Sequence, residues 1–310
     1  MKLQKTIIHP IKFSGVGLHT GLTANVIIKP APENFGIQFC RIDINPTLYI
    51  PARSENVSNT YRSTTIKKHD AEVITVEHLL SALYALEIDN ALVEIDNKEV
   101  PILDGSAKFY IDSIIENNTI ELNKYNNVYT IIDVIEWKDE QTGAEYIFLP
   151  HEEFSVTCLI DFPSKIIKHQ YAVLNDIKEY SVEIANAKTF CFLHEIEFLY
   201  NNGLIKGGNL NNALVFSEAA LSKDKINWLA KTFHQAANSI PEMGILNPLY
   251  QSYDNEAARH KILDVIGDLA LTQTYFKGKL IAYKPGHTSN VKFAQFLTEK
   301  YIKVEAEHSF

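Results

Sequence analysis

The sequence is poor in cysteine, and this limits the kinds of protein that it can encode. Its 310 residues include three cysteines, an odd number without a C-x-x-C spacing: Cys40, Cys158 and Cys191. Such a set argues against a disulfide framework and against a four-cysteine metal site. Unpaired thiols are typical of a reducing compartment, so we expect a cytoplasmic protein.

Positive charge and long apolar runs are also scarce. Asp and Glu number 38 against 29 Lys and Arg, which gives a formal net charge of −9. Binding to nucleic acid requires clustered Lys and Arg, and the sequence has no such run, so we expect no nucleic-acid partner. No apolar run approaches the ~20 residues of a transmembrane helix, and residues 1–15 lack the apolar core of a signal peptide. We therefore expect no membrane span.

What the sequence does have is an apolar fraction of 46%, enough for a sizeable core, and a length that favours two domains. The first domain is predicted to span residues 1–122. It opens with strand-like segments at Lys5–Ile11 and Thr23–Lys29. An amphipathic helix follows at Thr75–Leu86, then a strand at Ala91–Ile95 and a second helix that runs through Ile115.

The polar, Asn-rich stretch 116–127 is the best candidate for a domain linker. The second domain, residues 123–310, repeats the order of the first. Its predicted strands are 128–137, 145–149 and 154–160, followed by helical material at 181–187, a helix at 255–271 and a strand at 279–283. This echo favours two α/β sandwich layers of similar topology with an active cleft between them.

The helix predicted at residues 255–271 carries a pattern typical of metal ligands. An apolar stripe occupies one side, while His260, Asp264 and Asp268 gather on the opposite side. An imidazole and a carboxylate four residues apart can share one divalent ion if a third ligand comes from elsewhere. The same spacing is common on solvated helix faces, so by itself it leaves both interpretations open.

A third ligand is available in the helix predicted at residues 75–86, where Glu77 and His78 lie off the apolar stripe. With His78, the set becomes two imidazoles and one carboxylate with a fourth position for water, an arrangement typical of catalytic zinc. Mg²⁺ and Ca²⁺ prefer an all-oxygen shell. Glu77, adjacent to this ligand, is then a candidate general base, although a surface helix charge is an equally good interpretation.

A hydrolase also needs an acid for the leaving amine and a group that stabilises the oxyanion. His287 follows a predicted strand, in a turn that begins at Lys284, and Asp268 is a candidate partner that would raise its pKa and keep it cationic. A solvated loop histidine is the competing interpretation of the same pattern.

Several short motifs are distributed along nearly the full length of the chain. They are the turn 15–21 (GVGLHTG), Thr75–Leu79 (TVEHL), Ala187–Phe190 (AKTF), Leu204–Asn209 (LIKGGN), Arg259–Asp268 (RHKILDVIGD) and Gly286-His287. Together they closely resemble the UDP-3-O-acyl-N-acetylglucosamine deacetylase family, the zinc amidases of lipid A biosynthesis. The resemblance implies an α+β fold of two βα sandwich domains, one per half of the chain.

The resemblance also implies roles for individual residues. His78, His260 and Asp264 would bind Zn²⁺, and Glu77 would be the general base. His287 would stabilise the oxyanion and assist departure of the amine, and Asp268 would orient His287. The hydroxyl of Thr189 would hold the carbonyl oxygen, and Lys261 would contact the substrate.

Apolar substrate contacts are implied as well. Phe162 resembles the aromatic residue near the nucleotide sugar, and Phe190 the pocket residue beside Thr189. The segment 189–206 is the expected source of an acyl-chain passage, because Phe192, Ile196 and Leu199 follow at helical spacing. An amphipathic helix packed on the core is an equally good interpretation of that spacing.

The function implied is zinc-dependent hydrolysis of the N-acetyl group of UDP-3-O-acyl-N-acetylglucosamine, with release of acetate. A non-catalytic zinc-binding module and a zinc amidase for another acylated amino sugar are the alternatives. The family lysine expected near residue 140 has no clear counterpart here, which leaves the diphosphate contacts unassigned. Some relatives carry a fused C-terminal dehydratase domain, and we expect that domain to be absent from this chain.

Overall fold

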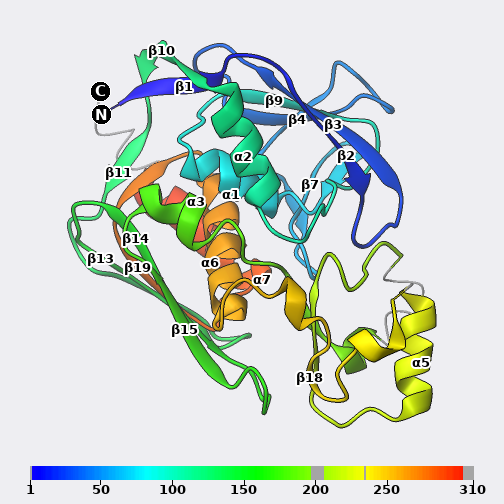
Figure 1. The fold of residues 1–310 in the computed structure, drawn as a ribbon. Coiled ribbons are helices and arrows are strands. Elements are labelled where there is room, and N and C mark those ends of the chain that lie inside the picture. The colour runs from blue at the N-terminus through cyan, green and yellow to red at the C-terminus, as the bar shows by residue number, and fades with distance from the viewer. Residues whose placement is uncertain (1, 197–205, 234, 303–310) are drawn as a thin grey trace.

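The computed structural model describes residues 2–196, 206–233 and 235–302, and each half of the chain contains one large mixed sheet (Figure 1). In the first half the strand order is β2-β3-β9-β4-β5. These strands are β2 (Ile11–Val16), β3 (Thr23–Pro30), β4 (Ile37–Arg41), β5 (Tyr49–Pro51) and β9 (Ala91–Ile95).

The sheet of the second half has the order β12-β13-β19-β14-β15, and a further strand, β11 (Val128–Thr130), pairs in parallel with β19. Its other strands are β12 (Ile135–Asp139), β13 (Ala144–Leu149), β14 (Phe154–Asp161), β15 (His169–Leu174) and β19 (Tyr275–Tyr283). Within these two five-strand orders, the central strands β9 and β19 each have one antiparallel and one parallel neighbour. The outer pairs are antiparallel in both sheets. The predicted likeness of the two topologies is therefore confirmed.

Each central strand is flanked by helices in the same way. Helix α1 (Glu77–Ala85) leads into β9 and α2 (Lys108–Asn117) follows it, while α6 (Glu256–Leu269) leads into β19 and α7 (His287–Leu297) follows it. In Figure 1 these helices lie between the two large sheets, and α1 packs on α6. The α+β class predicted from the sequence is confirmed.

Gly267 allows the two central helices to approach at the level of their backbones. A Cβ atom at this position would lie 2.2 Å from the carbonyl oxygen of Glu77. Any other residue here would push α6 away from α1. Gly267 therefore sets the distance between α1, which carries Glu77 and His78, and α6, which carries His260 and Asp264.

Each half also carries an insertion between its outer strands and its central helix. In the first half this is a sheet of β6 (Val57–Asn59), β7 (Thr65–Lys68) and β8 (Ala71–Ile74). In the second half it is larger and comprises α3 (Tyr180–Glu183), β16 (Phe190–Phe192), β17 (Leu214–Ser217), α5 (Lys223–Thr232) and β18 (Gly244–Ile245). Short 3-10 helices are Ser54–Asn56, Ile177–Glu179, Ala237–Ser239, Pro248–Tyr250 and Ala270–Thr272, and Thr298–Ile302 forms a π-helical turn.

The Asn-rich stretch 116–127, the candidate domain linker, contains regular secondary structure. Most of it is a strand, β10 (Thr119–Tyr125), which pairs with β1 (Leu3–Ile7) in a separate two-stranded sheet. The proposed boundary at residue 122 falls inside this strand, and the division into two domains stays a prediction.

Two predicted strands are divided in the structure. The segment Lys5–Ile11 contains the end of β1 and the start of β2, because Pro10 lies between them and lacks the N–H that a ladder needs. The segment 128–137 is divided between β11 and β12. None of the helices in the described part of the chain combines the length and the apolar character that crossing a bilayer requires.

The predicted helical pattern after Thr189 is wrong in its first part. Phe190 and Phe192 belong to β16, which pairs in parallel with β17, and helical structure begins only at Leu193. Leu199 lies outside the described residues. Ile196 is buried in a small apolar cluster within the second insertion.

Candidate active site

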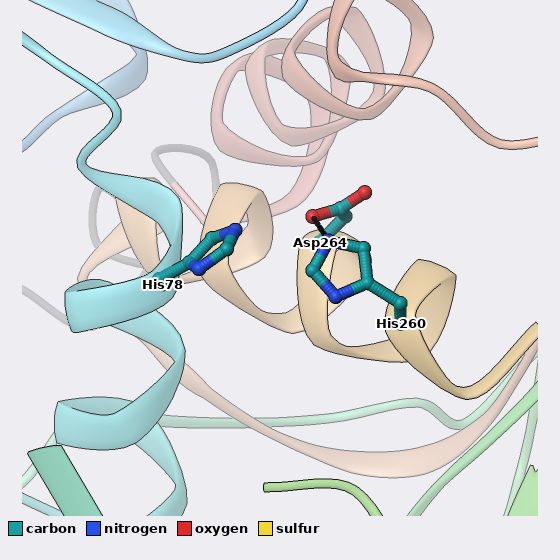
Figure 2. A group of neighbouring side chains, drawn as sticks. All are labelled: His78, His260 and Asp264. Atoms are coloured by element: carbon teal, nitrogen blue, oxygen red, sulfur yellow. Dashed lines mark ion pairs between the residues drawn. The ribbon is translucent and has the colours of Figure 1, made fainter. Parts of the chain in front are cut away.

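Three buried side chains from the two central helices converge as candidate metal ligands (Figure 2). His78 projects from α1, and His260 and Asp264 project from consecutive turns of α6. Their ligand atoms lie within 4.8 Å of one another, and no side chain in the set is more than 4% exposed. The alternative of a solvated helix face is therefore wrong for α6.

Both imidazoles are suited to metal binding because burial favours their neutral form. Burial, together with the neighbouring His260, lowers the pKa of His78 to about 3. The pKa of His260 is also lowered, mainly by burial. His260 Nδ1 lies 3.0 Å from the carbonyl oxygen of Ala187, to which its N–H can donate, and its Nε2 then faces Asp264 Oδ1 at 3.4 Å.

Asp264 is the charged member of the set. Burial by itself raises the pKa of this carboxyl, but the ammonium of Lys261 and the nearby imidazoles hold it well below its usual range. Lys261 Nζ donates to Asp264 Oδ2 at 2.8 Å. Asp264 Oδ1 has no hydrogen-bond partner within the described ranges. A buried carboxylate oxygen without a donor fits a cation in that position.

Glu77 lies beside these ligands, with its carboxylate buried at the start of α1. Burial raises its pKa to about 8. The main-chain N–H of Thr64 donates to Oε2 at 3.0 Å, and Oε1 lies 3.9 Å from Nε2 of His287. Glu77 is therefore not the surface charge that its sequence pattern also allowed.

His287 and Asp268 form a buried pair on the other side of the site. The Nδ1–H of His287 donates to Asp268 Oδ2 at 2.9 Å, while Nε2 lies 3.9 Å from Asp264 Oδ2. Although burial lowers the pKa of His287, the carboxylates of Asp268 and Asp264 raise it to about 9. This imidazole is therefore cationic near neutral pH. It begins α7 and does not lie in the predicted turn, since the helix starts directly after Gly286.

These groups border one cavity of about 250 Å³ that is lined by residues of both halves of the chain. Of the site residues predicted from the sequence and described by the structure, all line this cavity except Asp268, which lies behind His287. The lining residues among them are Glu77, His78, Phe162, Thr189, Phe190, Ile196, His260, Lys261, Asp264 and His287.

A family model described as UDP-3-O-acyl N-acetylglycosamine deacetylase matches residues 4–231 and 225–299. The chain belongs to this family. The resemblance seen in the sequence motifs is thereby confirmed.

Named relatives of this deacetylase family fall into two groups. The bifunctional enzymes LpxC/FabZ of Bacteroides thetaiotaomicron and Porphyromonas gingivalis are 44% and 39% identical over 95% and 99% of this chain. The chain spans 64% and 66% of their lengths. The UDP-3-O-acyl-N-acetylglucosamine deacetylase of Saccharophagus degradans is 38% identical over 93% of this chain and 88% of its own length.

One end of the cavity in this deacetylase-family chain is apolar. The ring centres of Phe190 and Phe162 lie 5.6 Å apart with their planes at 90°, and the ring centres of Phe162 and Phe192 lie 5.8 Å apart. Ile196 and Val215 continue this wall on the second insertion. Lys261 Nζ lies 5.6 Å from the centre of the Phe190 ring, so the ion pair with Asp264 borders the apolar end.

Several residues at this site were not predicted from the sequence. Thr64 is fully buried and bonds to Glu77 and Asp268, and His19 and Arg62 line the cavity beside Leu18. The main-chain N–H of His19 donates to the buried carboxylate of Glu99 at 2.9 Å. Among these residues, only Leu18 and His19 lie in a motif that was recognised in the sequence, the turn 15–21 that resembles the family. A lone threonine before a short strand gives none.

Proposed function

We propose that the chain hydrolyses the N-acetyl group of UDP-3-O-acyl-N-acetylglucosamine in the cytoplasm, as a zinc-dependent step of lipid A biosynthesis. The observation that carries this proposal is the meeting of three buried candidate ligands with Glu77 and His287 in one cavity. Relatives named for this deacetylation, one of them matched over 88% of its length, support the choice of substrate.

Two neutral imidazoles and a carboxylate are a donor set that suits zinc, and Oδ1 of Asp264, which accepts no hydrogen bond within the described residues, provides the negative ligand atom. When bound, zinc lowers the pKa of water toward ~7 and polarises a carbonyl group. The set leaves a position for water and substrate, as hydrolysis requires.

Glu77 acts as the general base that takes a proton from water as the oxygen attacks the acetamide carbon. Burial raises its pKa to about 8. A cation beside it favours the carboxylate, which is the form that accepts the proton. Its Oε1 faces the site because Oε2 accepts from Thr64.

His287 acts on the opposite side of the carbonyl group. Its cationic imidazole stabilises the negative charge on the carbonyl oxygen, and its Nε2–H protonates the nitrogen as the C–N bond breaks. Acetate and a free amine are the products. Asp268 keeps this imidazole charged and oriented, and the hydroxyl of Thr189 donates to the same carbonyl oxygen.

The substrate is held by the lining residues that do not take part in proton transfer. Phe162 contacts the nucleotide sugar, Lys261 contacts polar groups of the substrate, and Phe190 and Ile196 contact the 3-O-acyl chain. This division follows the cavity, which is polar at the candidate ligands and apolar at the second insertion.

Acetate release measured with the purified protein tests the proposal and separates it from the alternatives. Zinc content is determined in the same preparation, and UDP-N-acetylglucosamine with and without the 3-O-acyl chain serve as substrates. We expect one zinc per chain and rapid acetate release from the acylated compound only. A zinc-containing protein without hydrolysis would be a binding module, and hydrolysis indifferent to the acyl group would indicate another amino sugar.

A further inference from the structure

Thr64 contacts both of the groups that move protons in the proposed reaction. Its main-chain N–H donates to Glu77 Oε2 at 3.0 Å, and its hydroxyl donates to Asp268 Oδ1 at 2.5 Å. The same hydroxyl oxygen lies 3.3 Å from His287 Nδ1. Thr64 is fully buried and is not among the residues that line the cavity.

The contact with Glu77 determines which carboxylate oxygen faces the site. Because Oε2 accepts from the Thr64 N–H, Oε1 is the oxygen that lies 3.9 Å from His287 Nε2. The carbonyl of Thr64 in turn accepts from the N–H of Val76, directly before α1. The main chain at Thr64 is therefore attached to the start of α1 whatever side chain it carries.

The contact with Asp268 fixes the carboxylate that supports His287. Oδ1 accepts from the Thr64 hydroxyl, while Oδ2 accepts from His287 Nδ1–H at 2.9 Å and from Asn290 Nδ2 at 2.8 Å. With donors on both oxygens the carboxylate cannot rotate without breaking a hydrogen bond. The imidazole then keeps its Nε2 directed into the site.

We propose that Thr64 is a positioning residue that aligns the Glu77 carboxylate and the His287 imidazole with each other. It couples the first insertion, where it precedes β7, to the carboxylate of Asp268 on α6 and to the start of α7. It acts through these groups and has no contact of its own with substrate. The inference rests on the proposed function, since the two groups are its base and its acid.

Replacement of the hydroxyl in the full chain tests this role. Thr64→Val keeps the shape and the main-chain bonds but removes the donor to Asp268, and Thr64→Ser keeps the donor. Thr65, the next residue, is also buried, and its side chain has no hydrogen bond to a site residue in the described part of the chain, so Thr65→Val is the matched control. For each protein we would measure kcat and KM for acetate release, zinc content and the thermal midpoint.

We expect Thr64→Val to lose about 10–100-fold in kcat, the usual effect of removing a supporting partner, with KM and zinc content near wild type. Thr64→Ser and Thr65→Val should stay close to wild type in kcat. If Thr64→Val fails to fold, Thr64→Ala replaces it, with the same loss expected. Wild-type kcat in a folded Thr64→Val or Thr64→Ala protein overturns the inference, as does an equal loss in Thr64→Ser. Absence of acetate release from the wild type would instead overturn the proposed function.

Discussion

The two halves of the molecule share one sheet order and one helix arrangement but differ in what is inserted before the central helix. The first insertion, β6–β8, is a small sheet that brings Thr64 against Glu77 and Asp268. The second insertion is larger and contributes apolar residues to the cavity, among them Phe190 and Ile196. The common scaffold brings the central helices together. In the proposed function, the first insertion orients the reacting groups and the second recognises the substrate.

The largest effect should come from removal of one proposed metal ligand, from either α1 or α6. We expect His78→Ala in the first half, or Asp264→Ala in the second, to abolish tight zinc binding and to reduce activity by more than ~10³-fold, because the remaining two ligands hold zinc poorly. Metal analysis after dialysis, combined with the acetate assay, checks both. His151→Ala, at an exposed histidine, is the control. A full equivalent of tightly bound zinc in His78→Ala would show that the ligand set is wrong.

The next effect concerns a residue that only the first half supplies. Glu77→Ala should lower kcat by ~10²–10⁴-fold and leave zinc content nearly unchanged, since a general base lowers the proton-transfer barrier without binding the ion. Steady-state kinetics and metal analysis on one preparation measure the two quantities. Near-wild-type turnover would remove Glu77 from the reaction.

A smaller effect should distinguish the two insertions. Burying a methylene group is worth ~0.8 kcal/mol, so loss of a long 3-O-acyl chain should lower kcat/KM by about 10²-fold or more even after ordering costs. Ile196→Asp and Phe190→Ala, in the second insertion, should reduce the difference in kcat/KM between the acylated and the non-acylated substrate. Thr64→Val, in the first, should slow both substrates alike. If Ile196→Asp leaves this difference in kcat/KM unchanged, the apolar residues of the second insertion are part of the protein core and do not contact the acyl chain.

The smallest effect is a displacement of the pH profile. His287 has a pKa raised to about 9, so its protonated form dominates below that pH and activity should fall as pH rises through about 9. Asp268→Asn removes the nearest negative charge, which lowers this pKa and should move the alkaline limb to lower pH by about 1–3 units. Profiles of kcat against pH for the two proteins give the comparison. An alkaline limb at the same pH in both would assign it to a different group.

The central elements of both halves were predictable because their patterns are local. Strand β9 was predicted with the bounds that the structure has, and α1 and α6 differ from prediction by one or two residues at each end. Strand β10 was not predictable, since none of its residues is buried and its pairing with β1 joins distant parts of the chain. The pairing of β16 with β17 similarly overrides the helical spacing after Thr189.

The site was predictable to the extent that its residues stand in motifs. His260 and Asp264 have helical spacing, and His78 has a charged neighbour, so each gives a signal in the sequence. Thr64 gives none, because its importance comes from three contacts with residues that lie far along the chain or in another element. That His287 begins a helix and does not lie in a turn depends on the packing of α7 against α6, which is also non-local.

The proposed zinc ligands lie in different halves of the chain, His78 in one and His260 and Asp264 in the other, so zinc binding would be coupled to conformational stability. An unfolded chain separates these ligands, so zinc would bind the native state almost exclusively and would shift the unfolding equilibrium by mass action. At a free zinc concentration 100 times the dissociation constant, the native state gains about 2.7 kcal/mol. A chelator would therefore lower the melting temperature as well as the activity, and a variant with a weakened α1–α6 contact, such as Gly267→Ala, would depend on zinc to stay folded.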